Sequence, residues 1–459
     1  MKKLLLLAFI LIINCQLSII NCSAQYTKLL DFTGTANGSY SQGSLISDGT
    51  FLYGMAGGGG ANGYGVVFKI KPDGTGYSDL HDFSGANGSY PRGDLYSDGT
   101  FLYGMTSGGG ANSQGVVFKI KPDGTGYAKL LDFAGANGNN PNGSLISDGT
   151  FLYGMTSIGG ANNAGVVFKI KHDGTGYSKL IDFSVANGTN PDGSLISDGT
   201  FLYGMTWSGG ANSKGVVFKI KPDGTGYAKL LDFSGANGSN PGGSLISDGT
   251  FLYGMTYGGG ANSYGVVFKI KPDGTGYSDL HDFSWANGKN PYGSLISDGT
   301  FLYGMTPWGG ANDSGIVFKI KPDGTGYSKL LDFSAANGYF PFGSLISDGA
   351  FLYAMTRDGG ANNKGVVFKL GIVTGIAENN EQNDFIVSPN PTSGQFQITS
   401  DELRITNVEI YNVLGEKVYS LNHSFTHSLI NLSAQPSGVY FLQIKTEQGN
   451  MTKKIVINK

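Results

Sequence analysis

The stretch SDGTFLYGMTSGGGANSQGVVFKIKPDGTGY, residues 97–127, returns about every fifty residues with few changes. A fixed period of roughly 20–50 residues is typical of repeat architectures, in which each copy is one supersecondary unit. The last copy ends at Leu370. Seven copies can be counted, beginning at Tyr26, Tyr77, Tyr127, Tyr177, Tyr227, Tyr277 and Tyr327.

Each copy contains four strand-like runs, which in the second copy are YSDLHDF (77–83), DLYS (94–97), TFLYGMT (100–106) and GVVFKIK (115–121). The dipeptide Asp98-Gly99 joins the second and third runs and is a two-residue hairpin signal, so it predicts antiparallel pairing. The runs FLYGM and GVVF do not alternate strictly, which indicates that both faces of the sheet are covered. Small four-stranded sheets repeated at this period are typical of propeller blades.

The order of the runs also predicts how the ring closes. If each blade runs outwards as SLIS, TFLYGMT, GVVFKIK and YSKLLDF, the seventh blade lacks its outer strand. The N-terminal run YTKLLDF (26–32) can supply that strand and cover the open edge. We therefore predict an all-β, seven-bladed propeller over residues 25–370, closed by its N-terminal strand. A parallel β-helix is the main alternative, but it has no use for seven Asp-Gly hairpins.

The first 24 residues have the layout of a secretory signal peptide. Lys2 and Lys3 precede an apolar run, and a small-residue site predicts cleavage after Ala24. Both cysteines, Cys15 and Cys22, lie inside this segment. The mature chain is therefore expected to have no cysteine, no disulfide and no transmembrane segment.

Composition divides the rest of the chain. Glutamate is absent from residues 26–370 and occurs from Glu378 onwards, which places a boundary near 371. We predict a linker over 371–383 and a second domain over 384–459. The net charge of −3 gives no electrostatic case for binding nucleic acid or an anionic membrane.

Two loops differ between copies far more than the rest of the repeat, and we call them the variable loops. One follows GMT, between the second and third strands, and the other is the crossover between blades. In an antiparallel meander both lie on the same face of the ring. Drift is one explanation, since loops vary by default. However, the replacements are large aromatic residues and arginine, which are enriched in contact surfaces.

We therefore predict a ligand-binding face made by the variable loops, concentrated on the later blades. The early blades carry Gly57, Gly58, Ser107 and Gly108 at the corresponding positions, so the face is expected to be lopsided. The residues predicted to contact the ligand are Trp207, Tyr257, Trp308, Arg357, Asp358, Lys214, Tyr264, Trp285, Tyr292, Tyr339, Phe340 and Phe342.

The sequence contains no recognisable catalytic or metal-binding motif. Gly58, Gly60 and Gly63 match a dinucleotide pattern, but they lead into a strand rather than a helix. The unrepeated acids Asp94 and Asp192 are scattered among blades, and no cofactor is predicted. An enzyme with an axial site remains an alternative, because propellers host catalysis at the axis.

Two resemblances extend this interpretation. The order LYGMTSGGGANSQGVVFKI (102–120), DGTGY and LLDF resembles the GloVer-type, or choice-of-anchor, tandem-repeat proteins over residues 26–370. Met105 stands where that family more often has threonine. The family has no established activity, so the resemblance implies export and surface display rather than a mechanism.

The C-terminal segment is similar to the type A sorting domain of the type IX secretion system. The similarity rests on VSPNPTSGQFQI (387–398), SGVYFLQI (437–444) and KKIVINK (453–459). It implies a Bacteroidetes-type bacterium, an immunoglobulin-like sandwich, and export across the inner and outer membranes to the cell surface or medium. The residues that match the sorting motif are Pro389, Asn390, Pro391, Gly394, Gly415, Gly438, Tyr440, Lys453 and Lys454.

Together these features predict an exported binding or adhesion propeller whose ligand is a glycan or a protein. The type IX secretion machinery is its expected partner through the C-terminal domain. A structural surface coat and a glycan-active enzyme are the two alternatives.

Overall fold

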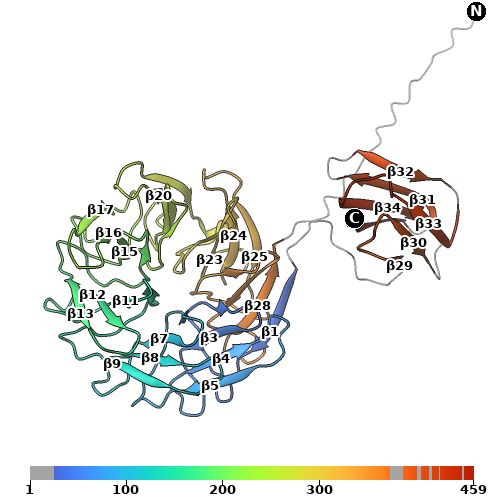
Figure 1. The fold of residues 1–459 in the computed structure, drawn as a ribbon. Coiled ribbons are helices and arrows are strands. Elements are labelled where there is room, and N and C mark those ends of the chain that lie inside the picture. Colours follow the sequence, from blue (N-terminus) through green and yellow to red (C-terminus); the bar gives the residue numbers. More distant parts are fainter. Residues whose placement is uncertain are drawn as a thin grey trace, which may run out of the picture. The chain divides into compact units, whose positions relative to one another are not determined.

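Seven four-stranded antiparallel sheets follow one another around a ring in the repeat unit (Figure 1). The computed structural model describes residues 25–372, 386–400, 405–412, 416–422, 424–446 and 449–458. The signal peptide with Ala24, most of the predicted linker and Gly415 lie outside the described residues. The repeats and the C-terminal segment form two separate units, and each is described by itself.

The blades are numbered in chain order, and their strands run from the ring axis outwards. The strands are β2 (Ile46–Ser47), β3 (Leu52–Ala56), β4 (Val66–Ile70) and β5 (Ser78–Asp82) in blade 1; β6 (Tyr96–Ser97), β7 (Leu102–Thr106), β8 (Val116–Ile120) and β9 (Ala128–Asp132) in blade 2; β10 (Ile146–Ser147), β11 (Phe151–Thr156), β12 (Val166–Lys171) and β13 (Ser178–Asp182) in blade 3; and β14 (Ile196–Ser197), β15 (Leu202–Thr206), β16 (Val216–Ile220) and β17 (Ala228–Asp232) in blade 4.

The later blades repeat this order. Their strands are β18 (Ile246–Ser247), β19 (Leu252–Met255), β20 (Val266–Ile270) and β21 (Ser278–Asp282) in blade 5; β22 (Ile296–Ser297), β23 (Leu302–Thr306), β24 (Ile316–Ile320) and β25 (Ser328–Asp332) in blade 6; and β26 (Ile346–Ser347), β27 (Phe351–Met355), β28 (Val366–Gly371) and β1 (Tyr26–Asp31) in blade 7. A 3₁₀ turn, η1 (Trp285–Asn287), lies in the crossover before blade 6.

The Asp-Gly turns form as the sequence predicts. The Asp98 carboxylate accepts the N–H groups of Thr100 and Phe101 at 2.8 and 2.7 Å, and it accepts the Tyr103 hydroxyl at 2.8 Å. The same three contacts occur in every blade. The repeated aspartates are therefore explained by turn geometry.

The hydrophobic core lies between neighbouring blades. Met105 and Val117 of blade 2 pack with Leu152 and Phe168 of blade 3 in one cluster, and equivalent clusters occur around the ring. Both faces of each sheet are thus covered, which explains why the strands lack strict alternation.

The N-terminal strand closes the ring. β1 pairs antiparallel with β28, and the Tyr26 ring stacks on Phe368 with 5.5 Å between centroids. The Tyr26 hydroxyl donates to the Asn337 carbonyl oxygen at 2.7 Å, and Phe32 is fully buried. The predicted strand-sharing closure is confirmed.

The C-terminal unit is a small two-sheet sandwich. Its sheets contain β29 (Ile386–Ser388), β30 (Gln395–Thr399) and β33 (His427–Asn431) on one side, and β32 (Lys417–Leu421), β31 (Ile405–Asn412), β34 (Gly438–Thr446) and β35 (Gly449–Ile457) on the other. Asn390 of the predicted sorting motif accepts the N–H of Val456 at 2.9 Å, and the Tyr440 hydroxyl donates to the Pro436 carbonyl oxygen at 2.9 Å. The first contact ties the motif's first segment to the last strand, β35, and the second fixes the turn before β34.

Candidate functional site

The variable loops of each blade meet edge to edge. The crossover that enters a blade forms an antiparallel bridge with the loop between the second and third strands of that blade. The bridges join Ser39 to Gly58, Ser89 to Gly108, Asn139 to Ile158, Thr189 to Ser208, Ser239 to Gly258, Lys289 to Trp308, and Tyr339 to Asp358. The two loops therefore form one continuous surface, which we call the variable face.

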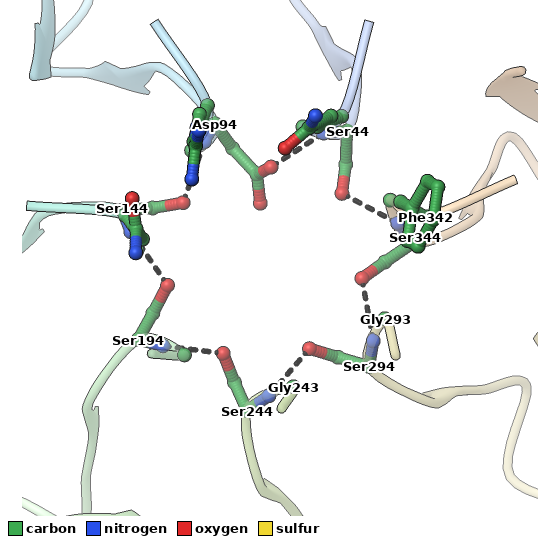
Figure 2. A pocket seen from close by; sticks show the side chains of 18 of the residues that line it. Ser44, Asp94, Ser144, Ser194, Gly243, Ser244, Gly293, Ser294, Phe342 and Ser344 are labelled. Atoms are coloured by element: carbon green, nitrogen blue, oxygen red, sulfur yellow. Dashed lines mark hydrogen bonds between the residues drawn. The ribbon is translucent and has the colours of Figure 1, made fainter. Parts of the chain in front are cut away.

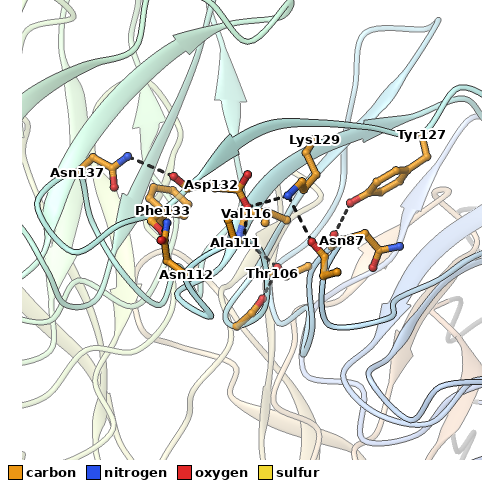
Figure 3. A network of polar contacts seen from close by, with 12 residues as sticks. Asn87, Thr106, Ala111, Asn112, Val116, Tyr127, Lys129, Asp132, Phe133 and Asn137 are labelled. Atoms are coloured by element: carbon orange, nitrogen blue, oxygen red, sulfur yellow. Dashed lines mark hydrogen bonds and ion pairs between the residues drawn. The ribbon is translucent and has the colours of Figure 1, made fainter.

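A repeated polar frame holds these loops in place (Figure 3). In blade 2, the Asp132 carboxylate accepts the N–H of Ala111 at 2.7 Å, and the Asn112 amide donates to the Phe133 carbonyl oxygen at 2.9 Å. The aspartate contact recurs in all seven blades. The aspartate anchor of the loop is thus common to all blades, and the largest differences between blades are in the side chains that project from it.

Most of the predicted contact residues form one aromatic arc. The rings of Trp207 and Tyr257 lie 5.2 Å apart, and those of Tyr257 and Trp308 lie 5.9 Å apart. Trp308 then contacts Phe340 and Phe342 at 5.6 and 5.5 Å. Other contacts bring in Tyr292, Tyr339 and the Arg357 guanidinium, which lies over Phe340 and Phe342 and bonds Asp358 at 2.6 Å. The members of this arc are half-buried against one another, and Asp358 is buried.

Three predicted residues lie outside the arc. Trp285 is 49% exposed and contacts Tyr264 at 6.4 Å between ring centroids. The Lys289 ammonium lies 3.1 Å from the Trp285 ring centroid and pairs with Asp313. Lys214 is exposed. The structure thus divides the predicted set between the arc and a separate Trp285–Tyr264 pair.

A hollow of about 420 Å³ lies beside the arc, over blade 1, and we call it the glycine hollow. It exists because Gly57 and Gly58 stand where other blades carry Trp207, Tyr257, Arg357 or Trp308. Sequence reasoning treated these glycines as the bare side of the face and placed no site there. The residues that line the hollow are Tyr40, Gln42, Gly57, Gly58, Gly59, Gly63, Tyr90, Arg92 and Arg357.

A ring of six serine side chains and one aspartate surrounds the propeller axis (Figure 2). In each blade the backbone N–H at this position donates to the side-chain oxygen of the next blade, at 2.5–2.8 Å. The ring consists of Ser44, Asp94, Ser144, Ser194, Ser244, Ser294 and Ser344. The glycine before each of these residues allows the close approach, since a Cβ on Gly93 would lie 2.2 Å from the Gly143 carbonyl oxygen.

Asp94 and Asp192 line the same axial channel, so they are not scattered as their positions in the sequence indicated. Residues fifty or a hundred apart in the chain meet there because every blade contributes to the axis. Burial raises the pKa of Asp94, and hydrogen bonds from Ser44 and Ser144 partly oppose that shift. Burial also raises the pKa of Asp192, which accepts hydrogen bonds from Tyr292 and, at 2.6 Å, from Asn142.

Replacing Asp94 with serine, the residue of the other six blades, is expected to stabilise the propeller at neutral pH. An aspartate whose pKa is raised on folding does not lower the free energy of unfolding when it is protonated in both the folded and the unfolded state. The destabilisation grows as pH rises above the ordinary pKa of about 4, and it is constant above the raised pKa. Replacing a residue with the one found in the other repeats commonly raises the free energy of unfolding by about 0.5–2 kcal/mol. Thermal melts from pH 3 to 8 should show that the difference in melting temperature between Asp94→Ser and the unaltered protein grows with pH. A difference that does not change with pH would contradict this account.

The axial channel has a volume of only about 70 Å³. Small-molecule sites usually enclose roughly 300–1,000 Å³, a range that includes the glycine hollow but not the channel. Among the described residues, no three His, Cys, Asp or Glu side chains come together as potential metal ligands. No helix in the described ranges is long and apolar enough to cross a membrane.

Comparison with protein families confirms both resemblances. The Gloeobacter/Verrucomicrobia repeat matches residues 17–145, 96–257 and 246–380, and the secretion system C-terminal sorting domain matches residues 387–458. The comparison with curated proteins finds no match. A type IX sorting domain directs its protein to the cell surface or the medium.

Solved structures are similar at low identity, and two of them have TM-scores of 0.50 or more. The extracellular domain of BT4673 from B. thetaiotaomicron is 15% identical, with a TM-score of 0.51 over 94% of this chain and 59% of that one. An oligogalacturonate lyase in complex with manganese is 12% identical, with a TM-score of 0.50 over 76% and 94% of the two chains. PorZ, a surface component of the type IX secretion system of Porphyromonas gingivalis, is 14% identical, with a TM-score of 0.46 over 94% and 61%. The chain spans about three fifths of the length of PorZ and BT4673.

Proposed function

Because the chain belongs to the Gloeobacter/Verrucomicrobia repeat family and ends in a type IX sorting domain, we propose that its propeller is a surface-displayed or released binding module. The ligand is a glycan or a protein, and it binds on the variable face. One observation carries this proposal: on a loop frame repeated in every blade, bulky side chains gather into a single arc beside a hollow of ligand size.

The arc provides the contact chemistry. Aromatic side chains and arginine dominate the binding energy of most interfaces, and rigid aromatic rings also stack on sugars. Contacts among Trp207, Tyr257 and Trp308 hold the rings in fixed orientations before a ligand arrives. Such preorganisation lowers the entropy cost of binding.

The double variant Trp207→Ala with Trp308→Ala tests this proposal. Truncating a hot-spot aromatic costs roughly 2 kcal/mol or more, so ligand capture on a glycan and protein array should fall at least about tenfold. Some loss of melting temperature is expected because both rings are half-buried. Phe101→Ala, which removes a ring beside an Asp-Gly turn, should leave capture unchanged. A folded double variant that still binds would support loop drift instead.

An enzyme with an axial site is the second candidate, since Asp94 and Asp192 meet in the channel. Against it, the channel is small, and the Asp94 carboxylate already completes the ring by accepting the Ser44 N–H. Asp192→Asn should therefore have no effect in an assay of glycan cleavage. If the unaltered protein cleaves a glycan and this variant does not, the enzyme is favoured.

A further inference from the structure

We propose that the glycine hollow binds an acidic sugar, one that carries a carboxylate such as a uronic acid. Arg92 and Arg357 would hold the carboxylate, and Tyr40 and Tyr90 would contact the faces of the sugar rings. This inference rests on the proposed binding function and names the ligand class and its place on the variable face.

The charge of the hollow is of one sign. Two arginines line it and no carboxylate does, although the whole chain has a net charge of −3. Arg92 is exposed and has no carboxylate within ion-pair distance among the described residues, although it attracts the Asp192 carboxylate of the axial channel at longer range. Arg357 bonds Asp358 through Nε, which leaves its terminal amino groups for a ligand. Lys364 adds a third cation at the rim, where its ammonium donates to the Tyr40 hydroxyl at 3.0 Å.

The tyrosines of the hollow adopt an unfavourable backbone conformation. Tyr40 and Tyr90 both have φ of 57°, in the left-handed region that bulky residues rarely occupy. Four other blades place asparagine here, a residue that tolerates this conformation. The asparagines are Asn140, Asn190, Asn240 and Asn290.

Asparagine also makes contacts that tyrosine cannot. Asn190, Asn240 and Asn290 each donate a side-chain hydrogen bond to a carbonyl of a neighbouring variable loop at 2.8–3.0 Å. The third aromatic residue at this position, Phe340, belongs to blade 7, so the three exceptions occupy adjacent blades around the hollow. Strain that persists at adjacent positions of one surface indicates a functional constraint.

Both tyrosine rings are partly exposed to a ligand, although the Lys364 ammonium lies over the Tyr40 ring, 4.9 Å from its centroid. Tyr40 is 40% exposed and Tyr90 is 48% exposed, whereas the rings of the arc are half-buried against one another. Tyr64 packs edge-on against Tyr90 at 6.0 Å and orients it. These rings offer flat surfaces for the apolar faces of a sugar.

The floor of the hollow offers backbone groups instead of side chains. In five other blades the residue equivalent to Gly57 donates its N–H to the crossover carbonyl, as Trp207 does to Asn190 at 3.0 Å. Gly57 makes no such bond, so its N–H is not committed to the crossover in blade 1. No aliphatic side chain lines the hollow, which favours a polar sugar over a peptide side chain.

The test measures binding of the mature chain, residues 25–459, to uronate oligosaccharides and to their neutral counterparts. We expect uronates to bind and neutral sugars to bind at least tenfold more weakly. Arg92→Gln should lower uronate affinity about tenfold or more, because it removes a charged hydrogen bond to the carboxylate. The affinity should also fall as salt is raised, since the contact is exposed to screening.

A second variant fills the hollow. Gly58→Trp copies Trp308 at the equivalent position, where a Cβ would lie 3.2 Å from the Ser39 hydroxyl and 3.3 Å from the Tyr40 ring edge, so these two side chains need to move by only a few tenths of an ångström. It should abolish uronate binding without unfolding the ring. Thr50→Trp is the control: it adds the same side chain to blade 1 at an exposed residue of the Asp-Gly turn, whose bond to Asp48 is made by the backbone N–H, and binding should survive.

Three outcomes would overturn the inference. Binding that persists in Gly58→Trp and Arg92→Gln but is lost in the Trp207/Trp308 double variant would move the ligand to the arc and leave the proposed function intact. Equal affinity for acidic peptides would show that the hollow recognises negative charge rather than a sugar. Absence of any captured glycan or protein would instead remove the proposed function itself.

Discussion

A mature chain that lacks residues 25–33 is expected to aggregate or to lose its cooperative melting transition. The deletion removes β1 and leaves the edge of β28 unpaired over Val366–Gly371. It also removes buried Leu29 and Phe32 and the partly buried rings and chains around them. Each buried side chain of this kind stabilises by about 1.5–3 kcal/mol, so the loss is comparable to the roughly 5–15 kcal/mol that keeps a domain folded.

Calorimetry and size-exclusion chromatography would measure this effect. Deleting residues 374–382 removes the same number of residues and should leave the melting temperature of the propeller unchanged. A synthetic peptide of residues 25–33 added in excess should restore the transition, because the missing strand is held by pairing and packing alone. A truncated ring that melts like the intact one would show that closure by β1 contributes little.

Removing residues 384–459 is expected to strand the protein in the periplasm. The secretion machinery recognises the sorting domain, so the propeller should fold but fail to reach the surface. Cell fractionation with an antibody against the repeats would locate it. The mature surface form should itself lack this domain, and finding the domain on most surface copies would contradict the type A assignment.

The fold could be predicted from sequence because the turn and strand signals of each blade lie within one repeat. Asp98-Gly99 fixes one hairpin, and the position of YTKLLDF ahead of the first inner strand predicts the shared blade. Both signals are local or follow from the order of the runs. The aromatic arc was predictable for a related reason: equivalent positions in adjacent blades, such as Trp207 and Tyr257, must be neighbours in a ring.

The glycine hollow could not be found in the same way. A hollow is made by absent side chains, and Gly57 and Gly58 stand in a repeat already rich in glycine. Only the comparison with Trp207 and Trp308 shows that side chains are missing there. The aromatic residues Tyr40 and Tyr90 gave a weaker signal, because their backbone conformation is visible only in the structure.

The axial ring was missed because its residues look ordinary. Serine after glycine is unremarkable in one repeat, and its hydrogen bond to Ser194 or Ser244 crosses fifty residues of sequence. Asp94 stood out as an unrepeated acid, yet its partners Ser44 and Ser144 could be identified only from the ring geometry.

Amide hydrogen exchange of the mature chain, with and without the ligand captured on an array, tests most directly where this propeller binds. The account predicts slower exchange in the variable loops, centred on residues 37–43, 56–65 and 87–93 and extending to 206–215 and 306–315. Slower exchange confined to the Asp-Gly turns, at residues 48–50 and their equivalents, or to the C-terminal unit would contradict it.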